Sequence, residues 1–169
     1  MQSKSYREIV AECAQQVNEI FPWDLIAAQE GGKEYLLIDI RCPSEFQVMH
    51  IENSTNVPRG ILEMACDFGY EETVPELVRS REKAILLICR SGNRSILAAH
   101  TMQLMGFREV ISLKTGLRGW SDYELPLVFS NGLPVKQEIA DRYFEPDVSP
   151  EQQGLEPAQG ATGRGVVTR

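Results

Sequence analysis

The hydrophobic pattern alternates between short apolar runs and segments whose apolar residues recur at helical spacing. The runs at residues 35–40, 84–88 and 110–114 have the length and aliphatic composition of strands buried on both faces. A shorter run at residues 55–57 is a further strand candidate. Because helical segments separate these runs, the pattern predicts an α/β fold, a parallel sheet with helices on both faces.

The first 20 residues read as an amphipathic helix that precedes the sheet. Their apolar residues share one helical face, which predicts a helix from about Ser5 to Glu19. Pro22 suits the first position of a second helix, which would end before Gly31. Further helices are expected at residues 43–49, 61–66, 75–81, 97–105 and 116–124.

The C-terminal part carries turn signals and then loses its apolar pattern. Asn131-Gly132 lies between two apolar runs, which predicts a β-hairpin. With a short helix at 137–144, this hairpin would form an appendage over residues 129–144. We expect residues 145–169 to be a disordered tail, because they are rich in Pro, Gly and Gln and lack an apolar period.

Cys89 stands at the junction between the buried run at 84–88 and the next helical segment. In an open parallel sheet, ligands bind beyond the carboxyl ends of the strands. The first amides of a helix lack intrahelical partners and attract anions, and a thiol held there ionises more easily. Gly92 lets successive amides converge on one point. Arg90 and Arg94 add positive charge, so we interpret Cys89 as a reactive thiolate.

Composition and charge narrow the classes of partner. The chain has 169 residues and a formal net charge of −7, which argues against nucleic acid as a partner. No stretch has the length and apolar character of a membrane span, so we expect no membrane partner. The four cysteines form no Cys-x-x-Cys pair, and with only two histidines we expect no metal site. This cysteine usage suits a reducing cytoplasm, which is the predicted location.

The loop resembles the active-site loop of the rhodanese family, and the resemblance extends from about Leu36 to Leu127. Met49 and Thr115 depart from it, since the family usually has glycine at both positions. The resemblance implies a three-layer fold with a five-stranded sheet, here a rhodanese-like domain over residues 21–128. The segments that resemble the family signatures are Asp39-Ile40-Arg41 with Pro43, Glu45 and Phe46, then His50-Ile51, Asn56 to Gly60, Cys89 to Ser95, and Gly116 with Gly119 and Trp120.

The resemblance implies a sulfurtransferase of the thiosulfate:cyanide type. Cys89 would take the sulfane sulfur of an anionic donor, such as thiosulfate or a low-molecular-mass persulfide, and hold it as a persulfide. An acceptor thiol, cyanide or a protein acceptor would then remove the sulfur, and no cofactor would be needed. The donor-binding residues would be Arg90, Ser91, Gly92, Asn93, Arg94 and Ser95.

Two other functions remain open for the same loop. The protein could be a persulfide carrier or binding module for a protein partner. It could also be a cysteine-dependent phosphatase or arsenate reductase, whose loop is similar but places its arginine one residue further from the cysteine. Four residues separate Cys89 from Arg94, and Ser95 stands where that arginine would be.

Four other polar residues lie near the same edge of the predicted sheet. Asp39 and Arg41 are interpreted as supporting residues that pair with their neighbours and fix the loop, with a place at the mouth of the site as the alternative. For His50 we favour a structural hydrogen bond over a role as general base. Cys42 is a candidate resolving thiol.

Overall fold

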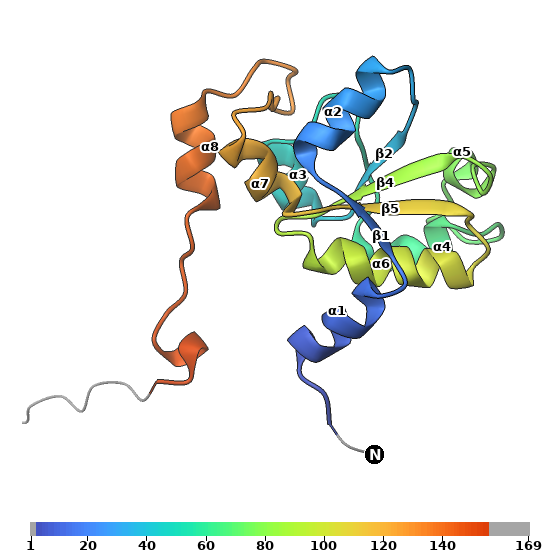
Figure 1. Ribbon diagram of the computed structural model, residues 1–169, viewed down its shortest axis with the longest axis horizontal. Helices are drawn as coiled ribbons and strands as arrows, with labels where there is room; N and C mark the ends of the chain where they lie inside the picture. The colour runs from blue at the N-terminus through green and yellow to red at the C-terminus, as the bar shows by residue number, and fades with distance from the viewer. Residues whose placement is uncertain (1–2, 156–169) are drawn as a thin grey trace, which may run out of the picture.

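A parallel sheet of five strands forms the centre of the molecule, in the order β1-β5-β4-β2-β3 (Figure 1). The structure is a computed structural model and describes residues 3–155. All four neighbouring strand pairs are parallel, which confirms the predicted fold class. The strands are β1 (Asn18–Ile20), β2 (Leu36–Asp39), β3 (Thr55–Asn56), β4 (Ala84–Ile88) and β5 (Glu109–Leu113).

Helices cover both faces of the sheet, as the apolar runs predicted (Figure 1). Alternate residues of β4 point to opposite faces, so Ile85 and Leu87 join one core cluster while Leu86 and Ile88 join the other. α4, α5 and α6 pack on the first cluster, and α2, α7 and α8 pack on the second. The helices are α1 (Tyr6–Ala14), α2 (Pro22–Glu30), α3 (Pro43–Val48), α4 (Leu62–Ala65), α5 (Pro75–Val78), α6 (Asn93–Leu104), α7 (Gly116–Asp122) and α8 (Gln137–Phe144), with 3-10 turns η1 (Arg59–Ile61) and η2 (Glu151–Gln153).

The first 20 residues are not one helix, so that part of the prediction is wrong. A capping box between Ser5 and Glu8 starts α1, but the helix ends at Ala14. Residues Asn18–Ile20 instead form β1, which pairs with β5 through Asn18↔Ile111 to Ile20↔Leu113. Asn and β-branched residues are weak helix formers, and pairing with the open edge of β5 outweighs their helical periodicity.

The C-terminal hairpin forms only in part, whereas the predicted helix α8 is present at Gln137–Phe144. The ribbon around Asn131-Gly132 is reduced to a single bridge between Val128 and Pro134. Pro134 has no N–H to donate, and the N–H and C=O of Val128 are both taken by His50. Two backbone hydrogen bonds still join the two segments, from the Phe129 N–H to the Leu133 carbonyl and from the Val135 N–H to the Leu127 carbonyl, each at 2.9 Å, so the hairpin is present but short.

The tail predicted to be disordered falls into two parts. Residues 145–155 have a described conformation that includes η2, and the Glu145 carbonyl accepts a hydrogen bond from Arg90. That contact with the loop after β4 ties the beginning of this part to the folded domain, which accounts for the departure from the prediction. Residues 156–169 lie outside the described part of the chain. None of the helices in residues 3–155 combines the length and apolar character needed to cross a membrane.

Candidate active site

Cys89 lies directly after β4, at the bottom of a loop that leads into α6. Its side chain is fully buried. The N–H of Gly92 donates a hydrogen bond to Cys89 Sγ at 3.1 Å, and Ser95 Oγ lies 3.3 Å from the same sulfur. The left-handed backbone of Gly92, with φ of 91°, turns its amide back toward the sulfur. The loop therefore encloses the sulfur with a backbone amide and a hydroxyl.

A buried pair of serines holds the loop from below. Ser95 Oγ donates to the carbonyl of Gly92 at 2.8 Å and lies 2.8 Å from Ser112 Oγ. Both serines are fully buried. Sequence reasoning missed Ser112, although a lone serine in the apolar run 110–113 was an available signal. These bonds fix the position of the Gly92 peptide beside the sulfur.

Free backbone amides surround the sulfur-bearing turn. No acceptor within residues 3–155 takes a hydrogen bond from the N–H groups of Ser91, Asn93, Arg94 or Ser95. Three of these groups belong to the first turn of the 12-residue helix α6, whose dipole favours negative charge at this end. The turn can therefore hold an anion with backbone groups alone.

The start of α7 fixes the other side of the loop. The N–H groups of Leu117 and Arg118 donate to the carbonyls of Cys89 and Arg90 at 2.9 and 3.0 Å. Gly116 permits this approach, since a Cβ there would lie 2.5 Å from the Cys89 carbonyl oxygen. Thr115, where the family usually has glycine, adopts a left-handed backbone with φ of 66°. Such a conformation costs a β-branched residue roughly 1–2 kcal/mol, which the rest of the fold must offset.

Arg94 is paired with a carboxylate. Its guanidinium forms two hydrogen bonds with Glu45 of α3, at 2.9 and 3.0 Å. These bonds hold the pKa of Arg94 above its usual range. Burial alone would raise the pKa of Glu45, but the hydrogen bonds from Arg94 and the Cys42 amide outweigh it, so this pKa lies below its usual value. Arg94 thus links α3 to the loop, and its donor-binding role stays a prediction.

The Glu45–Arg94 pair should stabilise the protein in a pH-dependent way. A lowered carboxyl pKa gives stability that is present above the unfolded value of about 4.3 and is lost as the pH falls through the folded value. We expect Glu45→Gln to lower the free energy of unfolding by about 1 kcal/mol at pH 7, and by less at pH 4. Urea unfolding at both pH values measures this difference. Glu63→Gln, which breaks the more exposed pair with Arg59, is the matched control. An equal loss of stability at both pH values for Glu45→Gln would contradict a pH-dependent stabilisation by the Glu45–Arg94 pair.

Arg90 points toward the C-terminal segment. Its Nη2 donates to the carbonyls of Tyr143 and Glu145 at 3.1 and 3.3 Å. The guanidinium also lies over the rings of Tyr143 and Phe144, 5.4 and 5.3 Å from their centroids. Arg90 therefore ties the catalytic loop to the end of α8, a contact that the sequence did not predict.

Asp39 and Arg41 form a fully buried ion pair at the end of β2. Arg41 Nη2 donates to Asp39 Oδ2 and to the carbonyl of Met49, each at 2.7 Å. Asn56 Nδ2 donates to the carbonyls of Asp39 and Arg41. Met49 is buried with an extended backbone, φ of −163°, which any residue can adopt. This geometry favours the supporting interpretation of the pair.

His50 and Tyr6 lie near the site in different ways. His50 Nδ1 lies 3.0 Å from the Phe46 carbonyl and its ring stacks on Phe46, which favours the structural interpretation.

Tyr6, which sequence reasoning missed, belongs to α1, and α1 packs on α6. Partial burial, followed by the charge of Cys89, raises the pKa of the Tyr6 hydroxyl. A helix that lies before the family-like region thus brings a tyrosine near the catalytic loop.

The four cysteines differ in how far their thiols are exposed to solvent. Cys42 is exposed at the start of α3, and all four cysteines are free thiols. Cys66 is fully buried, and burial raises the pKa of its thiol to about 12. Within residues 3–155, no group of three or more His, Cys, Asp or Glu side chains is placed to hold a metal ion.

These differences predict the order of alkylation. At pH 8, a thiol with a pKa near 12 is ionised to about one part in 10⁴, and burial also blocks the reagent. We expect iodoacetamide to modify Cys42 well before Cys66, which should react only after unfolding. Peptide mass mapping over a time course measures this order. Modification of Cys66 in the folded protein at a rate similar to that of Cys42 would contradict it.

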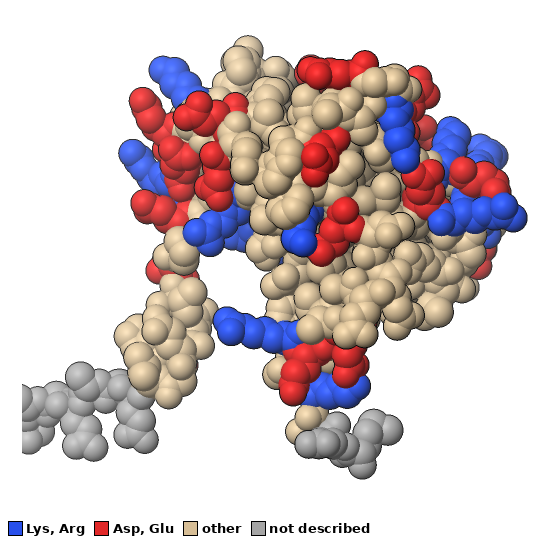
Figure 2. All heavy atoms as spheres, viewed as in Figure 1, with Lys and Arg blue, Asp and Glu red and all other residues tan. Residues whose placement is uncertain are grey.

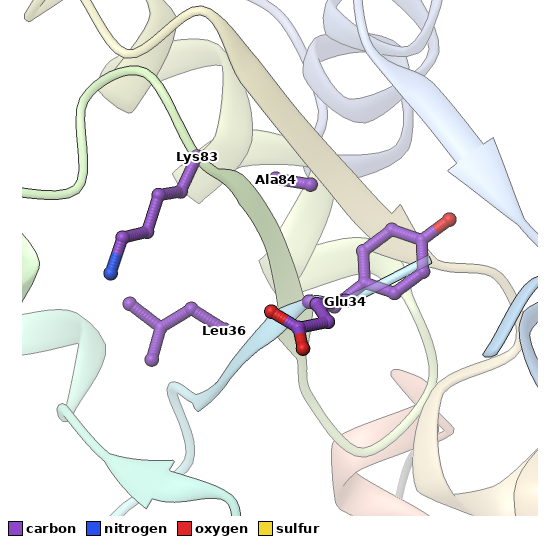
Figure 3. Close-up of a pocket in the computed structure, with 5 residues that line it drawn as sticks. Glu34, Leu36, Lys83 and Ala84 are labelled. Atoms are coloured by element: carbon purple, nitrogen blue, oxygen red, sulfur yellow. The ribbon is translucent and has the colours of Figure 1, made fainter. Parts of the chain in front are cut away.

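Two of the cavities lie at opposite ends of the sheet. A cavity of about 350 Å³ is lined by Glu34, Leu36, Lys83 and Ala84 (Figure 3). Since these residues are at the beginning of β2 and β4, the cavity is remote from Cys89, which follows the end of β4. A larger cavity, about 620 Å³, borders the loop itself at Arg90 and Ser91.

Comparisons with known proteins agree with this geometry. The family model of the rhodanese-like domain matches residues 23–123. A sulfurtransferase of Allochromatium vinosum is 28% identical over 116 residues, which cover 69% of this chain and 99% of that protein. An adenylyltransferase and sulfurtransferase of Candida albicans is 32% identical over 103 residues, 61% of this chain. The chain spans less than a quarter of the length of the first curated relatives that it matches.

A solved structure resembles this one over most of its length. It is a protein of unknown function from Rhodopseudomonas palustris, described as a possible tyrosine phosphatase. The TM-score is 0.66 at 27% sequence identity, and the match covers 75% of this chain and 96% of that protein.

Proposed function

Because this chain belongs to the rhodanese family, we propose that it transfers sulfur through a persulfide on Cys89. The observation that carries the proposal is the position of the sulfur, which lies 3.1 Å from the Gly92 amide at the start of α6, beside four further amides without acceptors. These groups suit a thiolate and then a persulfide anion, much as an oxyanion hole stabilises developing charge. The proposed donor is an anion with a sulfane sulfur, such as thiosulfate.

The first step moves one sulfur atom from the donor to the enzyme. The Cys89 thiolate attacks the outer sulfur of thiosulfate, the S–S bond of the donor breaks, and sulfite leaves with the bonding electron pair. The negative charge of the thiolate passes to the outer sulfur of the new persulfide. Since Cys89 is fully buried at rest, this step requires its side chain or the loop to move toward the exposed Ser91.

The second step returns Cys89 to its starting state. A nucleophilic acceptor, cyanide or a thiolate, attacks the outer sulfur of the persulfide. The S–S bond breaks, and its electron pair stays on Cys89 as the thiolate. Because each substrate reacts in turn with the enzyme, the kinetics should be ping-pong.

Two alternatives have specific observations in their favour. The similarity to a putative sulfur carrier protein of Bacillus subtilis, 34% identical over 85 residues, favours a persulfide carrier that passes sulfur to a protein acceptor. The similarity to a described possible phosphatase favours phosphate-ester hydrolysis. The loop itself opposes hydrolysis, because Arg94 is one residue closer to Cys89 than a phosphatase arginine and is paired with Glu45.

The test is the intact mass of the protein after incubation with thiosulfate. We expect a gain of one sulfur atom, which cyanide removes as thiocyanate. If thiosulfate adds no mass, glutathione persulfide is the next donor. Failure with both donors, together with hydrolysis of an aryl phosphate, would overturn sulfur transfer in favour of phosphatase activity. Slow turnover with small acceptors but fast transfer to a protein would identify a carrier.

A further inference from the structure

A cavity of about 620 Å³ separates the catalytic loop from the C-terminal segment. The loop contributes Arg90 and Ser91, α7 contributes Arg118, and residues 142–148 form the opposite wall. Figure 2 shows a hollow beside the segment that leaves α8, with basic side chains on its border. The volume lies in the range of small-molecule sites. Ser91 is two residues from Cys89, so a molecule in this cavity lies next to the reactive loop.

The cavity concentrates positive charge on an acidic protein. Arg90, Arg118 and Arg142 line it, whereas the chain as a whole carries −7. In the described part of the chain, none of these three guanidiniums forms an ion pair with a carboxylate. Glu145 and Asp147 also line the cavity and are exposed to solvent, as Arg118 and Arg142 are, so the lining carries three positive and two negative side chains. Since Arg90 already bonds to two carbonyls of the segment, Arg118 and Arg142 are the cations left for a ligand.

The wall opposite the loop is partly apolar. Tyr143 and Phe144 line it, and Phe144 is buried in the core cluster beneath. Arg90 stacks on both rings and holds this wall in place. A ligand that matches the cavity therefore combines a carboxylate with a short carbon skeleton, which suits an organic molecule better than a bare inorganic anion.

We propose that this cavity binds the carboxylate of an organic thiol that accepts sulfur from Cys89. Arg118 and Arg142 bind the carboxylate, and the thiol end of the molecule lies toward Ser91. The acceptor thiolate attacks the outer sulfur of the Cys89 persulfide, the S–S bond breaks, and its electron pair remains on Cys89. The product is the persulfide of the acceptor. This inference rests on the proposed sulfur transfer and names the acceptor class.

The segment that forms the wall lies outside the region that the family model matches. That region ends at residue 123, whereas the wall consists of residues 142–148. The cavity therefore depends on an addition to the shared domain. Acceptor preference would then be a property of this chain, set by its C-terminal segment.

The first experiment measures binding without any sulfur chemistry. Methylthiosuccinate, a dicarboxylate whose sulfur is blocked as a thioether, is titrated calorimetrically into the full chain. We expect the Arg118→Gln/Arg142→Gln variant to bind it at least tenfold more weakly, because charge-assisted hydrogen bonds are lost. Arg108→Gln removes one positive charge at an exposed arginine before β5, away from the cavity, and should bind as the parent does. No binding by the parent, or unchanged binding by the double variant, would overturn the inference.

The second experiment measures acceptor preference in turnover. With thiosulfate as donor, kcat/KM is compared for mercaptosuccinate and for uncharged 2-mercaptoethanol. We expect the parent to prefer mercaptosuccinate, and the double variant to lose most of that preference through a higher KM. Equal preference in both proteins would overturn the acceptor assignment. If the mass experiment shows no persulfide while methylthiosuccinate still binds, the proposed function fails and the cavity remains an anion site of another kind.

Discussion

Cys89→Ser is expected to reduce sulfur transfer on the order of a thousandfold or more, the largest effect in this protein. A serine hydroxyl is not ionised at neutral pH and cannot hold a sulfane sulfur as a persulfide, so the covalent route is lost. The hydroxyl can keep the contacts of the sulfur with the Gly92 N–H and with Ser95 Oγ, so the fold should be retained. Thiocyanate formation from thiosulfate and cyanide measures the rate, and intact mass measures the sulfur adduct.

The matched control for Cys89→Ser is Cys42→Ser. Cys42 is an exposed free thiol at the same edge of the sheet. If Cys42 takes no part in the transfer, its variant retains the parent rate with small acceptors. A sulfur adduct that persists in Cys89→Ser and disappears in Cys42→Ser would show that Cys42, and not Cys89, carries the sulfur.

Asp39→Ala is expected to lower the free energy of unfolding by about 3–5 kcal/mol. The substitution leaves the fully buried Arg41 guanidinium without its charge partner. Arg41 Nη1 already lacks a hydrogen-bond partner within the described residues, so little is available to compensate. Urea unfolding at pH 7 measures the loss, with the slope m as a check that the transition stays two-state.

A double variant separates lost charge pairing from lost packing. Asp39→Ala/Arg41→Met removes both charges, so no unpaired buried charge remains. We expect it to be more stable than Asp39→Ala alone. If Asp39→Ala costs less than about 1 kcal/mol, or the double variant is the less stable of the two, the pair does not support the fold as its geometry indicates.

The elements that sequence reasoning identified are those whose signal is local. The run at 84–88 and the helix beginning at Asn93 needed no distant partner, so the cysteine at their junction was evident. β1 was missed because its three residues become a strand only by pairing with residues of β5, each of which lies 93 positions later in the chain. Helical periodicity in a short segment cannot report such a partner.

Side-chain directions were the least predictable part of the site. The sequence placed Arg90 and Arg94 beside the sulfur, but their partners come from α8 and α3. Ser112 supports the loop from a strand that sequence reasoning interpreted only as an apolar run. In each case, the deciding contact joins residues at least 17 positions apart, and a single sequence does not show which of them meet.

The short strands at the two edges of the sheet also bear on self-association through strand pairing. The two outermost strands, β1 and β3, contain only three and two residues, so each sheet edge offers few free backbone groups to a second molecule. A chain shortened to begin at residue 21 would lose β1 and expose the five-residue, largely apolar β5. Such a fragment would still contain the whole family-matched region, but its new edge would favour aggregation through strand addition.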